Sequence, residues 1–317
     1  MTSLPDRQAS LASPAVLIPF LLITLIWSST WIVIKDQLGA GPEAVPAAWS
    51  VAYRFAFASA AMFAMARISG ASLRIGRQGH WLALAIGIPQ FVLNFNLVYA
   101  AERYVTSGLV AVVFALLVVP NALLARLIFK KTVSRQFLAG SAVAMVGVGL
   151  LFAAELRASE TMATPVLIGI GFTLLAVIAA SIGNLLQLAQ AVRKLPIASL
   201  LAWSMLYGTL VNAAIAVAGH GPPVFETRPA YWLGLLYLGL VASAFAFFFY
   251  YRIIRAIGPA KAAYSSVLVP IVAMLLSTLF EDYRWTGLAA AGGGLAIAGL
   301  IVALSGRRPA EPAPIAD

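Results

Sequence analysis

The sequence predicts an all-α integral membrane protein of ten transmembrane helices, formed by two inverted five-helix repeats. Three observations support this prediction: the composition, ten long apolar runs joined by short loops, and an internal duplication. Of the 317 residues, 62% are hydrophobic and only 10% are charged, with a mean hydropathy of +0.94. Soluble domains carry about 25% charged residues, so we expect the lipid bilayer to be the main solvent of this chain.

A spanning helix needs about 20 mostly apolar residues. The runs that qualify are 16–35, 46–66, 81–101, 106–126, 136–154, 165–190, 198–218, 230–251, 259–280 and 286–304. They are unbroken apolar runs and lack the alternation of barrel strands, so we interpret them as helices. The first run is longer than the apolar core of a signal peptide, which favours a first span.

The predicted organisation follows from these runs, and it includes no inserted soluble domain. Residues 1–15 form a cytoplasmic tail, residues 16–154 the first repeat and residues 165–304 the second repeat. The Pro- and Ala-rich segment 305–317 is expected to be a disordered cytoplasmic tail.

The duplication is visible in short motifs. Ala48-Trp49-Ser50-x-x-Tyr53 recurs 154 residues later as Ala202-Trp203-Ser204-x-x-Tyr207. An offset of 152 pairs glycines of the two halves, namely Gly87 with Gly239, Gly140 with Gly292 and Gly147 with Gly299. In so apolar a chain, a doubled unit indicates a transporter whose halves surround one central site.

The basic residues predict the orientation. With a cytoplasmic N-terminus, inner segments hold 15 of the 21 Lys and Arg residues and outer segments hold 5. Both termini are then cytoplasmic. Because each repeat has an odd number of spans, the second repeat enters the membrane from the opposite side. Lys130-Lys131 after span four and Glu281-Asp282 after span nine fit this inversion.

The sequence lacks the residues that several kinds of catalytic and metal site require. There is no cysteine, no H-E-x-x-H pattern and no G-x-S-x-G pattern, so we expect no catalytic residue, no metal site and no cofactor. The net charge is +10, but the charged residues lie between apolar segments and form no continuous basic face, which argues against a nucleic-acid partner. The expected partners are a small-molecule substrate and the lipid bilayer.

Arg54 is the one formally charged residue well inside an expected span. A charge at this depth must face the bundle interior or water and have partners. It serves either as a counter-ion for a carboxylate or phosphate of the substrate, or as a structural residue bonded to neighbouring carbonyls and amides.

Amides and aromatic residues supply the other candidates. Gln90 and Asn94 share one helix face, and Asn184, Gln187 and Gln190 recur every third residue in span six. Asn184 corresponds to Thr30 at the offset of 154. Buried amides serve either as contacts between helices or as ligand contacts.

Trp27 and Trp31 lie one turn apart and form, with Ser28 and Thr30, a candidate slot. Tyr53, Tyr207 and Tyr264 complete the candidate substrate-binding set, although many membrane Tyr and Trp residues are only interface anchors.

The acidic residues offer no obvious proton carrier. All of them fall in loops, in tails or at span ends. Glu102, at the outer end of span three, is either a group that titrates near the mouth or, as we expect, a solvated end charge. Exchange or downhill efflux is therefore at least as well supported as proton antiport.

The residues resemble EamA-type members of the drug/metabolite transporter superfamily. The matching features are Trp27-Ser28-Ser29-Thr30-Trp31-Ile32-Val33-Ile34-Lys35, Tyr53-Arg54-Phe55, and Pro270 followed by Glu281-Asp282 with Gly292 and Gly299. The resemblance covers residues 16–304 and implies a ten-span exporter of small metabolites. Lys130-Lys131 and the position of Pro120 depart from the family pattern, which puts the packing of span four in doubt.

The resulting hypothesis is an alternating-access exporter of amino acids, nucleosides or drug-like compounds in a bacterial inner membrane, as a monomer or homodimer. A channel, a sensor or a lipid-translocating subunit is the alternative, and only a carrier would saturate and show counterflow.

Overall fold

A computed structural model describes residues 13–39, 44–129, 134–158, 163–187, 189–257 and 265–305. These residues form helices joined by short turns, and none of them lies in a strand. Seven stretches are long and apolar enough to cross a membrane: Pro14–Gln37, Ala47–Ile68, Gly76–Ala101, Ser107–Ile128, Thr164–Leu186, Ile197–His220 and Pro229–Ile253. The all-α membrane fold is confirmed, whereas the count of ten spans stays a prediction.

The first half contains α1 (Pro14–Gln37), α2 (Ala47–Ile68), α3 (Gly76–Gly87), a π-helical segment η1 (Ile88–Leu93), α4 (Asn94–Ala101), α5 (Ser107–Ala115), α6 (Val118–Phe129) and α7 (Arg135–Ala158). The expected span 106–126 is broken between α5 and α6. Pro120 has no N–H to donate to the Leu116 carbonyl, which accepts instead from Val119 N at 2.8 Å.

The second half contains α8 (Ala163–Leu186), α9 (Gln190–Arg193), α10 (Ile197–His220), α11 (Pro229–Leu236), a π-helical segment η2 (Tyr237–Phe245), α12 (Ala246–Ile257), α14 (Ser265–Phe280) and α15 (Gly287–Ser305). The prediction that span six reaches residue 190 is wrong. A tight turn, in which Gln187 N donates to Asn184 O at 3.2 Å, ends α8.

Corresponding helices of the two halves run antiparallel, as inverted repeats require. Tyr53, near the start of α2, donates its hydroxyl to Val224 O beyond the end of α10, at 3.0 Å. Tyr207, in the first half of α10, hydrogen-bonds His80 Nδ1 of α3, beyond the end of α2, at 2.8 Å. The duplicated motif therefore binds groups that lie beyond opposite ends of the α2–α10 pair.

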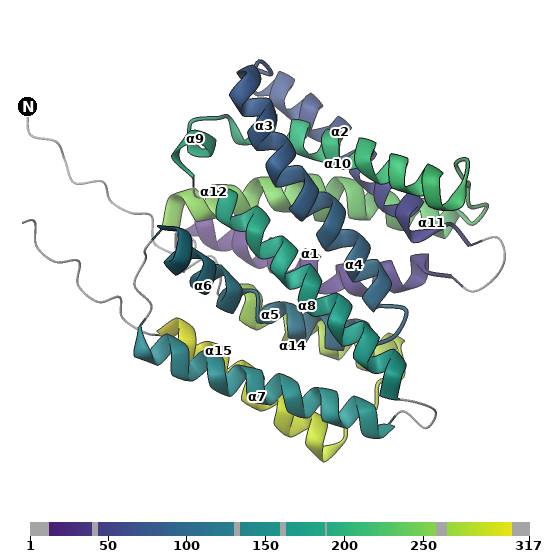
Figure 1. Cartoon of the computed structure of the whole chain (residues 1–317), viewed down its shortest axis with the longest axis vertical. Coiled ribbons are helices and arrows are strands. Elements are labelled where there is room, and N and C mark those ends of the chain that lie inside the picture. Colours follow the sequence, from purple (N-terminus) through teal and green to yellow (C-terminus); the bar gives the residue numbers. More distant parts are fainter. Residues whose placement is uncertain are drawn as a thin grey trace, which may run out of the picture.

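The same inversion holds for α7 and α15, which lie side by side at one edge of the bundle (Figure 1). A Cβ added at Gly147 would lie 2.3 Å from Ala296 N, and one added at Gly299 would lie 2.3 Å from Ala144 N. Only glycine permits backbones to approach so closely. The glycine spacing that revealed the duplication is thus the contact surface of this helix pair.

We expect Gly147→Ala to lower the thermal stability of the purified protein, because the new methyl group meets the α15 backbone. Overpacking of this kind costs about 1–3 kcal/mol. Gly149 in the same helix has no atom within 4 Å of an added Cβ, so Gly149→Ala is the matched control and should be neutral or slightly stabilising. Equal melting temperatures of the two variants in detergent would contradict this packing.

Candidate functional site

A cavity of about 140 Å³ lies between the two repeats. Helices α1, α2, α4, α5 and α6 and segment η1 line it from the first half, and α8, α12 and α14 line it from the second. Its lining residues are Trp27, Thr30, Trp31, Ile34, Arg54, Gln90, Asn94, Phe95, Val98, Ala111, Phe114, Ala115, Leu117, Val118, Asn121, Ala180, Asn184, Phe247, Tyr250, Ser265, Val269 and Pro270. Pockets for drug-sized ligands measure about 300–1,000 Å³, so this cavity fits a smaller molecule.

Arg54 brings a positive charge to this cavity although its residue is only 2% exposed. Its Nε donates to Ser243 Oγ at 2.9 Å, and its Cζ lies 4.4 Å from the centre of the Phe95 ring. Its Nη1 is buried and has no hydrogen-bond partner among the described residues. Within the described ranges, no carboxylate lies within salt-bridge distance of the guanidinium. The guanidinium is therefore a buried cation with one unpaired nitrogen.

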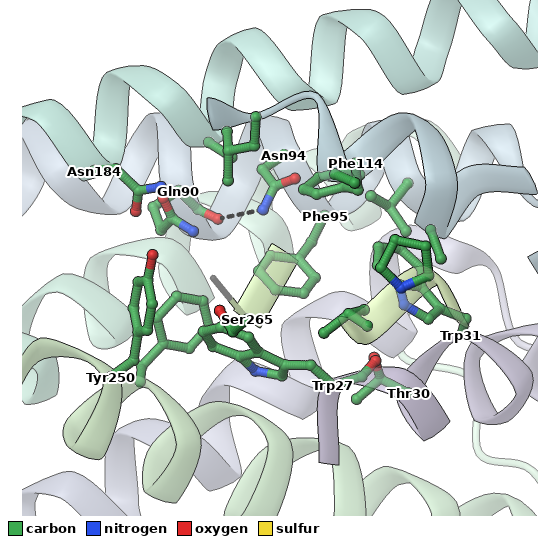
Figure 2. Close-up of a pocket in the computed structure, with 18 of the residues that line it drawn as sticks. Trp27, Thr30, Trp31, Gln90, Asn94, Phe95, Phe114, Asn184, Tyr250 and Ser265 are labelled. Atoms are coloured by element: carbon green, nitrogen blue, oxygen red, sulfur yellow. Dashed lines mark hydrogen bonds between the residues drawn. The ribbon is translucent and has the colours of Figure 1, made fainter. Parts of the chain in front are cut away.

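Amides form one wall of the cavity. Figure 2 shows Gln90, Asn94 and Asn184 together, opposite Trp27 and Tyr250. Asn94 Nδ2 donates to Gln90 O at 3.4 Å, while Gln90 Oε1 and Asn94 Oδ1 are buried without a partner in the described structure. A Cβ at Gly183 would lie 2.4 Å from Gln90 Oε1, so this glycine leaves room for the Gln90 amide. The wall therefore contains two buried acceptor oxygens without a hydrogen-bond partner among the described residues.

Aromatic rings form the opposite wall. The Trp27 ring lies edge-on to Tyr250 at a centroid distance of 4.9 Å, and its Nε1 donates to Ala242 O at 3.2 Å. Trp31 packs on Phe114, with ring centroids 5.3 Å apart. The Trp27 and Tyr250 rings give an apolar surface opposite the amides, whereas Phe114 lies beside Asn94 (Figure 2).

Seven of the sequence-predicted site residues line the cavity: Trp27, Thr30, Trp31, Arg54, Gln90, Asn94 and Asn184. Thr30 and Asn184, paired by the offset of 154, both belong to this set.

Four other predicted residues do not line this cavity. Ser28 donates to Thr24 O at 2.6 Å within α1, and Gln187 lies in the turn after α8. Tyr53 binds the loop after α10, and Tyr207 binds His80 of α3, as described above. Tyr264 lies outside the described residues.

Sequence reasoning missed other lining residues, namely Phe95, Phe114, Asn121, Phe247, Tyr250 and Ser265. Asn121 carried a usable signal, since it is an amide inside an apolar span next to Pro120. Its Oδ1 accepts from Ser181 Oγ at 2.7 Å, which links α6 to α8. The aromatic residues carried no such signal, because most rings of a membrane protein face lipid or neighbouring helices.

Comparisons with known proteins identify the family. The model of the EamA-like transporter family matches residues 15–153 and again residues 167–305. The chain belongs to this family. It is also similar to Protein PagO of Salmonella typhimurium, with 23% identity over 272 residues, which cover 85% of this chain and 84% of PagO.

Two further similarities agree with this EamA membership. A Salmonella typhimurium protein named "Probable amino-acid metabolite efflux pump" is 26% identical over 297 residues, covering 91% of this chain and 94% of that protein. A solved crystal structure is 17% identical, with a TM-score of 0.67 over 90% of this chain and 95% of that chain. The latter supports the fold alone. This chain is thus a multi-pass membrane transporter with a small-molecule substrate and a lipid-bilayer environment.

The cavity predicts a contrast between two neighbouring residues of α1. The chain has no native cysteine, so introduced thiols react without background. We expect Thr30→Cys to react several-fold faster with a small methanethiosulfonate reagent than Ser28→Cys, because Thr30 lines the cavity and Ser28 does not. Both positions are buried, so equal labelling rates would contradict this placement of the cavity.

Proposed function

We propose that this EamA transporter exports small organic metabolites, and that zwitterionic amino acids with apolar or aromatic side chains are its substrates. The observation that carries the proposal is the unpaired Nη1 of buried Arg54. No described carboxylate lies within salt-bridge distance of this guanidinium, so its counter-ion must come from another molecule. A buried cation is stabilised by an ionised, hydrogen-bonded partner, and a substrate carboxylate is a suitable one.

The rest of the cavity suits the other parts of an amino acid. An α-ammonium group donates three hydrogen bonds and accepts none, which matches the free acceptors of Gln90 and Asn94. An apolar side chain would pack on the wall formed by Trp27, Tyr250 and Phe247. A neutral nucleoside would leave Arg54 without a counter-ion, so the amino acid is favoured over the other metabolite classes.

The relative named an amino-acid metabolite efflux pump supports both this substrate class and the outward direction. We place the chain in a bacterial inner membrane with both termini in the cytoplasm, working as a carrier rather than an enzyme. The two repeats would rock about the cavity in alternating access. Because a single duplicated chain contains both sides of the cavity, a monomer suffices, and a homodimer remains compatible.

Counterflow in proteoliposomes tests the proposal. Purified protein is reconstituted with unlabelled phenylalanine inside and labelled phenylalanine outside. We expect saturable uptake that Arg54→Gln weakens about 10- to 100-fold in apparent affinity, since a hydrogen bond to a charged group contributes about 1.5–3 kcal/mol. Arg228→Gln changes a loop arginine with a half-exposed side chain and should leave uptake unchanged.

The amino-acid amide supplies a control on the ligand side. Phenylalanine amide keeps the ammonium group and the ring but lacks the carboxylate, so competition by the amide should be weak in the wild type and insensitive to Arg54→Gln. Equal losses for the acid and the amide would leave Arg54 with a structural role only. Uptake that does not saturate would favour a channel.

A further inference from the structure

Beyond the cavity, a cluster of buried polar side chains lies where α4 leads into α5. Glu102 follows the last residue of α4 and is 0% exposed. Ser107 begins α5, and Glu281 follows α14. Trp31 connects this cluster to the cavity, because it lines the cavity and its main-chain oxygen lies 3.1 Å from Ser107 Oγ. The expectation that Glu102 is a solvated end charge is therefore wrong.

The hydrogen bonds of Ser107 require an additional proton. Its Oγ lies 2.9 Å from Glu102 Oε2, 2.9 Å from Glu281 Oε1 and 3.1 Å from Trp31 O. A serine hydroxyl has one hydrogen to donate, and ionised carboxylates only accept. The contacts of Oγ with the two carboxyl groups are both hydrogen bonds only when one carboxyl group carries a proton and donates it to Oγ.

The neighbouring bonds indicate which carboxyl group carries that proton. Glu281 also accepts from Ser107 N, at 3.2 Å to Oε2, and from the hydroxyl of Ser277. These donors stabilise an ionised carboxylate. Glu102 has Ser107 as its single side-chain partner, and its Oε1 is buried without any partner in the described structure. Glu102 is therefore the group that is better satisfied in the protonated form.

Nearby charges do not supply a direct counter-ion for Glu102. Lys35 Nζ of α1 donates to the main-chain oxygen of Glu102 rather than to its carboxylate. Arg54 of α2 and Tyr99 of α4 interact with Glu102 only electrostatically, and α8, which packs on α4, has no charged residue. Burial raises the pKa of Glu102, just outside the span Gly76–Ala101, well above its ordinary value, and the Ser107 bond opposes this only in part.

We propose that Glu102, held by Ser107 against Glu281, is a proton-binding site next to the substrate cavity, protonated at neutral pH while this end of the bundle is closed. On deprotonation the Glu102 O–H bond breaks and the proton leaves to water. Ser107 then faces two carboxylates, whose repulsion weakens the contact between the end of α14 and the start of α5. The proton is thus a second ligand, and this inference goes beyond the proposed export of amino acids.

Infrared spectroscopy of the purified, reconstituted protein tests proton binding directly, with protons as the probe. A protonated carboxyl group gives a carbonyl-stretch band that an ionised carboxylate lacks. We expect this band in the wild type at neutral pH and its loss in Glu102→Gln, whose amide replaces the neutral acid with little change of shape. Asp36→Asn is the control and should keep the band, because Asp36 is an exposed acidic residue at the end of α1.

Two more variants separate the alternatives. Ser107→Ala should keep the band but shift the pH at which it disappears, because the remaining groups no longer share the hydroxyl. Glu281→Gln should also keep it. Absence of the band in the wild type at neutral pH, or its loss in Glu281→Gln and not in Glu102→Gln, overturns the proposal. If Glu102→Gln does not fold, Glu102→Asp should move the band instead.

Transport links this proton site to function in a second measurement. We expect the rate of phenylalanine counterflow to vary with pH in the wild type and to lose this dependence in Glu102→Gln but not in Asp36→Asn. The infrared result does not depend on the substrate, so failure of amino-acid transport would leave proton binding at Glu102 testable by itself. A pH dependence unchanged by Glu102→Gln would remove the site from the transport cycle.

Discussion

The structure depends on satisfying backbone carbonyls at the two π-helical segments, where no water is available inside a membrane. A π turn within an α-helix disturbs the regular bonding, and η1 and η2 occupy corresponding places in the two halves. Asn212 Nδ2 of the second half donates to Phe91 O in η1 at 2.9 Å. Trp27 Nε1 of the first half donates to Ala242 O in η2 at 3.2 Å. Each half thus completes the hydrogen bonding of the other.

These bonds also build the cavity. Trp27 is fixed by η2 and turns its ring to the cavity, while Arg54 is fixed by Ser243 of the same segment. A Cβ at Gly239 would lie 2.9 Å from Arg54 O, so glycine at this position lets η2 approach α2 closely enough for the Arg54–Ser243 bond. The cavity-lining groups Trp27 and Arg54 of the first half are therefore oriented by the second half, so the cavity needs both copies of the repeat.

The sequence predicted the features that repeat or that stand out against an apolar background. Paired glycines revealed the duplication, and Arg54, Gln90, Asn94 and Asn184 were identifiable because polar groups inside spans need partners. Tyr53 and Tyr207 belong to the duplicated motif and were among the candidates, yet their hydroxyls bind groups beyond the ends of the α2–α10 pair and do not line the cavity. The break before Pro120 and the π segments depend on tertiary contacts that local patterns do not encode, so the aromatic wall could not be derived.

Glu102 shows why position along the chain is a poor measure of depth for a titratable group. As the residue after an apolar run it reads as a surface charge, but α5 and the end of α14 close over it, and Glu281 comes from 179 positions further along the chain. The arrangement separates two electrostatic tasks. Arg54 lines the cavity, whereas Glu102, the proposed proton-binding group, lies at the contact between helices of both halves. In this proposal, a proton at Glu102 changes the contact that closes that end of the bundle and does not change the charge of the cavity wall. The pH is thereby coupled to the conformational step, while Arg54 binds the carboxylate of the substrate.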